Sequence, residues 1–156
     1  MYLSMTAKKD DKPYSGKYVE FFDNKIIELE TYFTNGKIEG HTISYFKNGN
    51  KWIEFTIRNG KFEGTFITNY ENGKPNIIHN FLNGKLNGTS NMWFNNGILN
   101  RSTEFKNNKP NGLSEEYYEN GQKKLSGNYK DGKPIGKWTY WKVNGEIQGY
   151  KNHEDN

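Results

Sequence analysis

The side chains in this 156-residue chain that could act as metal ligands or nucleophiles are not spaced so as to come together. There is no cysteine, which excludes a disulfide framework, a zinc–thiolate site and a thiol nucleophile. The three histidines are His41, His79 and His153. On the sheet argued for below, three strand spacings separate His41 from His79, roughly 14 Å, which is too far for shared metal ligation. We therefore expect packed or solvated histidines.

The carboxylates also lack the geometry of an acid–base pair. Glu115 and Glu116 are adjacent, and Glu119 follows shortly after. Neighbouring side chains on a strand point to opposite faces, so Glu115 and Glu116 cannot converge on one substrate atom. The glycines are spaced as turn residues, so a phosphate-binding loop is not supported, and no Ser-His-Asp set has a meaningful spacing. The sequence predicts a non-catalytic protein without a cofactor or a metal.

A column of lysines is the clearest candidate for anion binding. Five lysines stand 24 residues apart, at Lys37, Lys61, Lys85, Lys109 and Lys133. They could form a basic ladder for phosphate groups or anionic lipid, or they could be soluble turn residues that discourage aggregation of sheet edges. We favour the second interpretation, because acidic residues stand nearby in several units. The net charge of +4, from 22 basic and 18 acidic residues, does not favour nucleic acid.

The spacing of these lysines belongs to a repeat that runs through the chain. A glycine opens each of six 24-residue units, at Gly16, Gly40, Gly64, Gly88, Gly112 and Gly136. An asparagine stands eight residues into each, at Asn24, Asn48, Asn72, Asn96, Asn120 and Asn144. Gly follows this asparagine except in the first unit, which has Lys25. A fixed period of this length indicates an array in which each unit packs on its neighbours.

Turn residues divide each unit into two strands. The second turn lies at Asn35-Gly36, Asn59-Gly60, Asn83-Gly84, Asn107-Asn108 and Asp131-Gly132. Asn-Gly favours a type I′ hairpin turn, and we expect this turn at both positions of the unit. No apolar pattern has a helical period. The sequence therefore predicts an all-β fold, an elongated, twisted antiparallel meander of stacked β-hairpins in a single-layer sheet.

The turns also predict which residues share a face. Pairing outward from the first turn places each opening glycine opposite a large apolar residue on what we call the stacked face, at Phe33, Ile57, Phe81, Phe105 and Tyr129. The opposite, mixed face is more polar and carries an aromatic row. Its members are Phe21, Tyr45, Trp93, Tyr117 and Trp141, with Asn69 breaking the row. Trp52 is expected beside Tyr45, as its cross-strand partner. Exposed Trp and Tyr are typical interface anchors, so Tyr45, Trp52, Trp93, Tyr117 and Trp141 are the predicted partner-binding residues.

The last units resemble a known repeat. The segment from Gly127 to Gly145 contains Gly136-Lys137-Trp138, the aromatic pair Tyr140-Trp141 and Asn144-Gly145. This pattern, repeated in part at residues 116–124, resembles the MORN-repeat variant of the YwqK-type antitoxin family. In the first four units the Trp is replaced by Tyr18, Thr42, Phe66 and Ser90. The resemblance covers about residues 16–150 and implies an elongated sheet of hairpins that serves as a binding or scaffolding module.

The expected organisation is a tail or capping strand over residues 1–15, the repeat array over 16–150 and a tail over 151–156. The leading functional hypothesis is a module for protein–protein interaction, of antitoxin or immunity type. Its alternatives are a scaffold on anionic lipid and a glycan- or cell-wall-binding repeat; a homodimer through an uncovered sheet face is a further option. Met1 as the native start predicts a cytoplasmic protein, whereas a trimmed signal would place it in the envelope or outside the cell.

Overall fold

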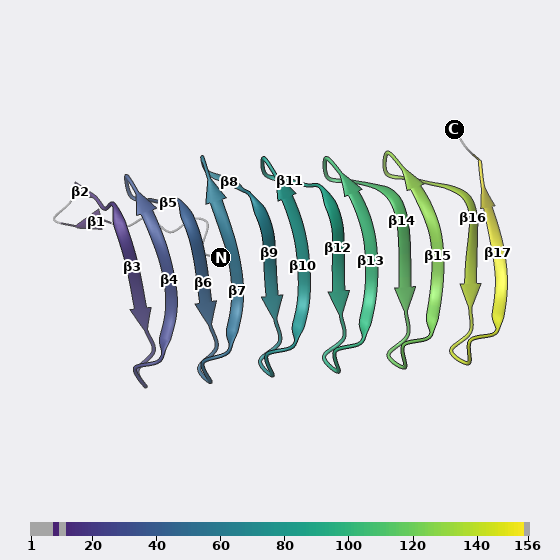
Figure 1. Ribbon diagram of the computed structural model, residues 1–156, viewed down its shortest axis with the longest axis horizontal. Coiled ribbons are helices and arrows are strands. Elements are labelled where there is room, and N and C mark those ends of the chain that lie inside the picture. The colour runs from purple at the N-terminus through teal and green to yellow at the C-terminus, as the bar shows by residue number, and fades with distance from the viewer. Residues whose placement is uncertain (1–7, 10–11, 155–156) are drawn as a thin grey trace.

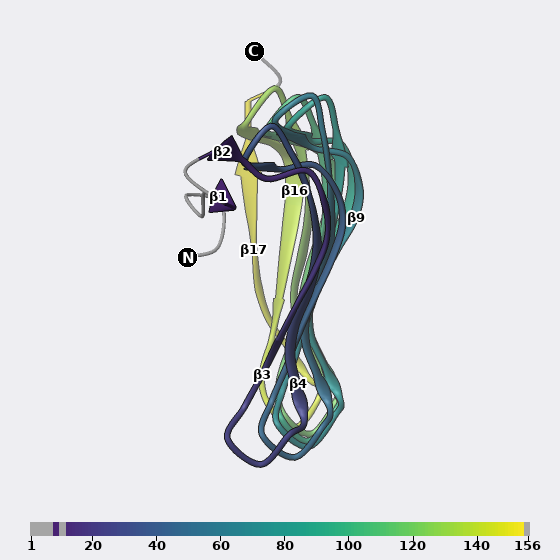
Figure 2. The same cartoon turned by 90° about the vertical axis from the view of Figure 1, so that its left-hand side faces the viewer.

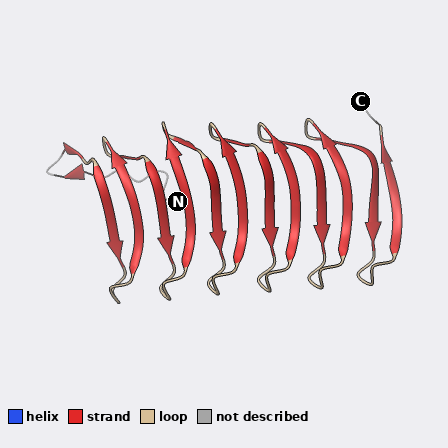
Figure 3. Cartoon of the chain, viewed as in Figure 1, coloured by secondary structure: helices blue, strands red, loops and turns tan. Residues whose placement is uncertain are grey.

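The computed structural model describes residues 8–9 and 12–154, and every regular element in that part of the chain is a β-strand (Figures 1 and 3). The fold predicted from the repeat is confirmed. One sheet runs in the order β17-β16-β15-β14-β13-β12-β10-β9-β7-β6-β4-β3, and β1 and β2 form a separate hairpin. Viewed along the array, the successive hairpins nearly superpose, with a gradual twist (Figure 2).

The strands recur with the repeat. The strands that open the units are β3 (Gly16–Phe21), β6 (Gly40–Tyr45), β9 (Gly64–Asn69), β12 (Gly88–Trp93), β14 (Lys109–Tyr117) and β16 (Lys133–Trp141). The returning strands are β4 (Ile27–Thr34), β7 (Lys51–Arg58), β10 (Pro75–Leu82), β13 (Leu99–Lys106), β15 (Lys123–Lys130) and β17 (Ile147–His153). The short strands are β1 (Lys8–Lys9), β2 (Lys12–Pro13), β5 (Lys37–Ile38), β8 (Lys61–Phe62) and β11 (Lys85–Leu86).

The second turn of each unit has the predicted geometry. Both central residues have positive φ, for example 50° at Asn35 and 74° at Gly36, as a type I′ turn requires. At Asn107-Asn108 the same geometry occurs without glycine, with φ of 52° and 67°. Asparagine tolerates the left-handed region better than other non-glycine residues, so this pair can replace Asn-Gly.

The first turn differs from the prediction. At the first turn of the second unit, Gly49 has a positive φ of 87°, whereas Asn48 does not have a positive φ. The amide of Gly49 donates to the carbonyl of Phe46 at 2.9 Å, and the amide of Phe46 donates to the carbonyl of Asn50 at 2.8 Å. This is a three-residue loop, a type I turn closed by a glycine in the left-handed region. The prediction of a two-residue type I′ turn here was wrong.

The asparagine of the first turn joins consecutive units. Its side-chain carbonyl accepts from the amide two residues ahead, as between Asn96 Oδ1 and Ile98 N at 2.9 Å. Its side-chain nitrogen donates to a backbone carbonyl of the next unit, as from Asn96 to Glu119 at 3.1 Å. The same inter-unit bond occurs from Asn24, Asn48, Asn72 and Asn120. We call this row the asparagine ladder; it uses both the donor and the acceptor of the amide, which explains why asparagine is repeated.

The predicted strand register is confirmed up to the first turn. Each opening glycine lies opposite its predicted partner, as in Gly40↔Ile57 and Gly112↔Tyr129. A β-bulge then shifts the register beside the turn, so that Tyr45 pairs with Lys51 rather than Trp52. The ring of Trp52 instead lies 5.8 Å from that of Phe46. The predicted Tyr45–Trp52 pair was wrong, because the three-residue loop needs one more residue on the returning strand than a two-residue turn does.

The stacked face holds the hydrophobic core, and most of its buried apolar residues lie in the N-terminal units. The buried cluster consists of Phe33, Ile38, Phe55 and Ile57. Rings fill the spaces between strands there, as where Phe55 and Phe66 stack at 6.1 Å between centroids. Because the sheet has one layer, these side chains bury one another along the face without a second sheet.

Strands extend into both terminal segments of the predicted organisation. Near the N-terminus, Lys9 pairs with Lys12 in the β1–β2 hairpin, which repeats the pairing of Lys130 with Lys133. The prediction placed a tail or capping strand over residues 1–15, of which residues 1–7 and 10–11 lie outside the described residues. At the other end β17 continues to His153, which pairs with Gly136. The expected tail over 151–156 is therefore shorter, since three of its residues complete a strand.

Candidate functional site

The aromatic residues predicted to bind a partner lie at one level of the array, close to the first turns. Tyr45, Trp93, Tyr117 and Trp141 are the last residues of β6, β12, β14 and β16. The last three stand on alternate strands, so successive side chains are separated by roughly 10 Å. All four are half-buried, and Trp52 is 37% exposed.

Two tyrosines of this row are held by carboxylates. The Tyr45 hydroxyl donates to Glu30 at 2.9 Å, and the Tyr117 hydroxyl donates to Glu115 at 2.7 Å. Burial, followed by the hydrogen bond to the carboxylate, raises the pKa of both tyrosines to about 12. Both phenols therefore stay protonated at neutral pH and act as donors fixed in place, not as bases.

Each of these carboxylates also binds a lysine. Lys17 lies 3.1 Å from Glu30, and Lys123 lies 2.6 Å from Glu115. The hydrogen bond from Lys17 lowers the pKa of Glu30. Burial acts to raise the pKa of Glu115, but the hydrogen bonds from Lys123 and Tyr117 outweigh it, and the pKa is lowered. At both sites a lysine neutralises the charge of the carboxylate, as is typical of side chains that stabilise the fold.

The tryptophans are positioned by neighbouring units. The carbonyl of Trp93 accepts from the Tyr70 hydroxyl at 2.7 Å, and that of Trp141 accepts from the Tyr118 hydroxyl at 2.9 Å. Lys123 lies 5.8 Å from the centre of the Trp141 ring. The row is thus fixed at both its backbone and its side chains.

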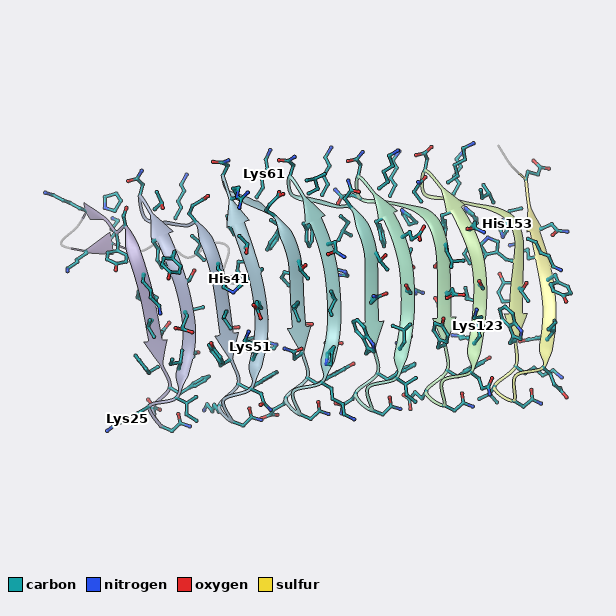
Figure 4. All side chains as sticks on the ribbon, viewed as in Figure 1. Lys25, His41, Lys51, Lys61, Lys123 and His153 are labelled. Atoms are coloured by element: carbon teal, nitrogen blue, oxygen red, sulfur yellow. The ribbon has the colours of Figure 1, made fainter. Side chains whose placement is uncertain are left out.

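The five lysines of the column lie together at the edge formed by the second turns, where Figure 4 labels Lys61. All are exposed. Other cations face three of them across the hairpin, in the pairs Lys61↔Arg58, Lys109↔Lys106 and Lys133↔Lys130. Within residues 8–9 and 12–154, none of these six side chains forms an ion pair. Carboxylates lie at the same edge, since Glu39 and Glu63 accept hydrogen bonds from the turn amides of Asn59 and Asn83.

The residues considered for catalysis do not converge. His79 stacks on Phe66 and hydrogen bonds to the Ser90 hydroxyl at 2.8 Å, and burial lowers its pKa. His41 lies 3.1 Å from Glu54 on β7. The described part of the chain contains no group of three His, Asp or Glu side chains that could hold a metal ion. Nor does it contain a helix that could cross a membrane.

A hollow on the stacked face was missed by the sequence reasoning. In the central units the inner positions carry small residues, Ser90, Thr103, Ser114 and Gly127, where several other units carry a ring, at Tyr18, Phe55, Phe66, His79 and Trp138. Ser90, Thr103 and Ser114 line a cavity of about 270 Å³ that extends from His79 to Trp138, and the indole of Trp138 fills the space over Gly127. Arg101, which replaces an aliphatic residue of other units, pairs with Glu116 at its rim. The size of residues 24 positions apart was the signal that could have revealed this hollow.

Comparison with known protein families identifies two segments of the array, residues 62–83 and 110–131. Both match the MORN repeat variant. Each MORN-type segment runs from one second turn to the next, and so contains one asparagine of the ladder. MORN repeats are generally binding modules and are typically non-enzymatic. The match concerns the repeat, and it does not extend to an antitoxin family. No curated protein matches the chain.

Proposed function

We propose that the chain is a non-catalytic module that binds another protein along the aromatic row of its mixed face. The observation that supports this most directly is the fixed position of the row. The phenols of Tyr45 and Tyr117 are hydrogen bonded to carboxylates, and Trp93 and Trp141 accept bonds from the preceding unit. Rigid, amphipathic rings lose little entropy when a partner covers them, which makes them effective interface anchors.

The spacing of the row favours a protein over a small molecule. Rings roughly 10 Å apart on alternate strands span a protein epitope or an extended chain. A small toxin neutralised by this module is one partner of that class. The repeated, nearly straight array would then provide the length of the contact, while the unit with Asn69 in place of an aromatic residue would set its register.

The proposal is tested by crosslinking two double variants to the partner protein in the source cells. Trp93→Ser/Trp141→Ser should abolish capture and leave the melting temperature within a few degrees of the parent. The matched control, Leu82→Ser/Leu113→Ser, removes two exposed apolar side chains of the same face near the second turns, away from the aromatic row, and should capture normally. Capture that survives loss of both tryptophans would contradict the proposal. Unfolding of the tryptophan variant would identify these rings as core and contradict it equally.

A second candidate function rests on the cationic edge. The lysine column and its cross-strand cations are exposed, and within the described residues they are not neutralised by ion pairs. An anionic membrane surface attracts lysines near it by about 1 kcal/mol each. We propose this edge as the contact with anionic lipid, if the module acts at a membrane.

Liposome sedimentation distinguishes this candidate. Lys109→Gln/Lys133→Gln should weaken binding to vesicles containing phosphatidylserine by about 2 kcal/mol, roughly 30-fold. Lys25→Gln/Lys47→Gln removes the same charge near the first turns and should have a smaller effect. High salt should weaken binding of the parent, because exposed charges are screened. Equal losses of vesicle binding in the two variants would exclude the edge of the second turns as a dedicated lipid-binding site.

A further inference from the structure

The two outermost strands of the array each pair on one side only. Among the described residues, β3 pairs with β4 and β17 pairs with β16, and both stand at the ends of the strand order (Figure 1). An open strand edge presents unpaired amide and carbonyl groups to another chain. The array therefore has two different ends, one at each extreme of its long axis.

Both ends expose apolar side chains that interior units cover. Phe21 on β3 is 57% exposed, whereas Tyr45 and Trp93, which occupy the same repeat position, are half-buried. At the opposite end Ile147 is 52% exposed and Tyr150 is 54% exposed. In interior units the equivalents of Phe21 and Tyr150 are half-buried, as Tyr45 and Glu54 are, although Lys51 and Pro75, at the repeat position of Ile147, are exposed. The exposed groups thus belong to half-interfaces of the kind that joins the units.

From this geometry we infer that a second copy of this chain binds end to end, with β17 of one copy paired antiparallel to β3 of the next. The interior joints fix the register. The same repeat positions pair at each of them, as in Glu30↔Ile43, Glu54↔Ile67 and Ser126↔Thr139. Continuing the array by one unit places Tyr150 opposite Val19 of the second copy.

This register matches the exposed groups of the two ends. Val19 of the second copy covers Tyr150, and its Phe21 lies beside Ile147. On the other face Lys151 stands opposite the ring of Tyr18 of the second copy, which suits a cation–π contact. The apolar residues at each end therefore meet apolar residues, and Lys151 meets an aromatic ring.

The asparagine ladder continues across the same joint. Asn144 accepts from the amide of Glu146 at 3.1 Å, as every other asparagine of the row does in its own loop. Within the described residues, its side-chain nitrogen donates to no acceptor, unlike those of the five preceding asparagines. The equivalent acceptor in the second copy is the carbonyl of Asp23. One joint thus reproduces the side-chain rows, the ladder and the strand pairing along β3, except beside β2, where Lys12 and Pro13 already pair with β1.

Such a contact is heterologous, because it joins two different surfaces. It leaves both outer ends free, so it produces chains of copies rather than a closed dimer. Each joint is one strand pair wide, which makes it small, and we expect weak, concentration-dependent association. Head-to-tail assembly would also align the mixed faces of successive copies into one longer surface.

The absence of cysteine permits a direct test of the register. An equimolar mixture of the single variants Val19→Cys and Tyr150→Cys should form a disulfide-linked dimer on mild oxidation, since directly paired strand residues have suitable Cβ separations. Val19→Cys mixed with Leu82→Cys is the control, because Leu82 is 51% exposed but lies mid-array. Equal crosslinking of the two mixtures would overturn the proposed pairing.

Sedimentation velocity of the cysteine-free chain provides the second readout. Mass should increase with concentration, and Tyr150→Lys should weaken association by at least tenfold. Leu82→Lys, with the same change in charge, should have no effect. A monomer at all concentrations overturns the inference. An equal loss in the two lysine variants also overturns it, because it would indicate contact through a face rather than through the ends.

Discussion

At the scale of single residues, the asparagine ladder makes the side-chain amide a structural element. Asn96→Asp keeps the acceptor for Ile98 but places a carboxylate oxygen against the carbonyl of Glu119. We expect a loss of about 1–3 kcal/mol in the free energy of unfolding, because a donor is lost and two acceptors face each other. Asn144→Asp, measured at low concentration, is the control, since Asn144 keeps only the bond within its loop. If chemical denaturation showed similar losses of unfolding free energy for Asn96→Asp and Asn144→Asp, a stabilising role of the asparagine ladder would be contradicted.

Gly127 is required for a different reason, because it provides space. A Cβ at this position would overlap the indole of Trp138, which is buried and lies 5.0 Å from the Tyr129 ring. Gly127→Ala should destabilise the chain by about 1–3 kcal/mol through overpacking. Gly149→Ala should change stability little, because a Cβ at that position would have no atom within 4 Å. Thermal melts of the two variants check this difference.

His79 should make stability depend on pH. Burial lowers its pKa, so the folded state favours the neutral ring. Its contribution is present above the unfolded pKa of about 6.5 and is lost as pH falls through the folded value. His79→Phe introduces the ring that Phe55 supplies in the second unit, and should reduce the loss of stability between pH 7.5 and pH 5. Urea unfolding at the two pH values measures this loss of stability. An equal loss in the parent and in His79→Phe would assign the pH dependence of stability to other groups.

At the scale of elements, the glycines of the hairpins are needed for backbone conformation. Gly97 has φ of +91° in the first turn, and Gly88 has φ of +99° where β12 begins. Valine at either position should cost about 1–3 kcal/mol. Crowding of Phe105 is not the reason at Gly88, because a Cβ there would lie 3.6 Å from Asn80, an ordinary contact.

Gly97→Lys separates backbone strain from crowding. The first unit carries Lys25 at this position with φ of 65°, so lysine can adopt the turn. The lysine variant should lose less stability than Gly97→Val in thermal melts. A valine variant as stable as the parent would show that the turn accepts another geometry.

The same elements show what sequence could predict. The 24-residue period gave the hairpins, the strand order and the partners of the opening glycines, because side chains alternate along a strand and the turns fix its phase. It failed at the first turn, since Asn-Gly fits both a two-residue and a three-residue loop, and only the inter-unit bond of the asparagine favours the second. The predicted pairing of Tyr45 with Trp52 was wrong for the same reason. The hollow beside Trp138 depends on packing between units, which no single unit encodes.

At the scale of the whole molecule, contacts between neighbouring units should make stability depend on their number. Deleting residues 88–111 removes one unit in register and brings Ser114 to the position of Ser90 beside His79. We expect a folded, shorter array with a lower melting temperature and the same circular dichroism spectrum per residue. Deleting residues 88–107 instead shifts the phase and should prevent folding of the segment that follows. Equal tolerance of both deletions would contradict packing by units.

The direction of the strands also determines how the array would respond to force. The chain enters at one end of the sheet and leaves at the other, so tension applied at residues 8 and 154 acts across the strands (Figure 1). Hydrogen bonds loaded in this direction separate one after another, as in a zipper, instead of sharing the load. Each 24-residue unit that opens would release about 80 Å of chain from about 10 Å of sheet. The molecule should therefore be a soft, extensible linkage that lengthens in steps of about 70 Å.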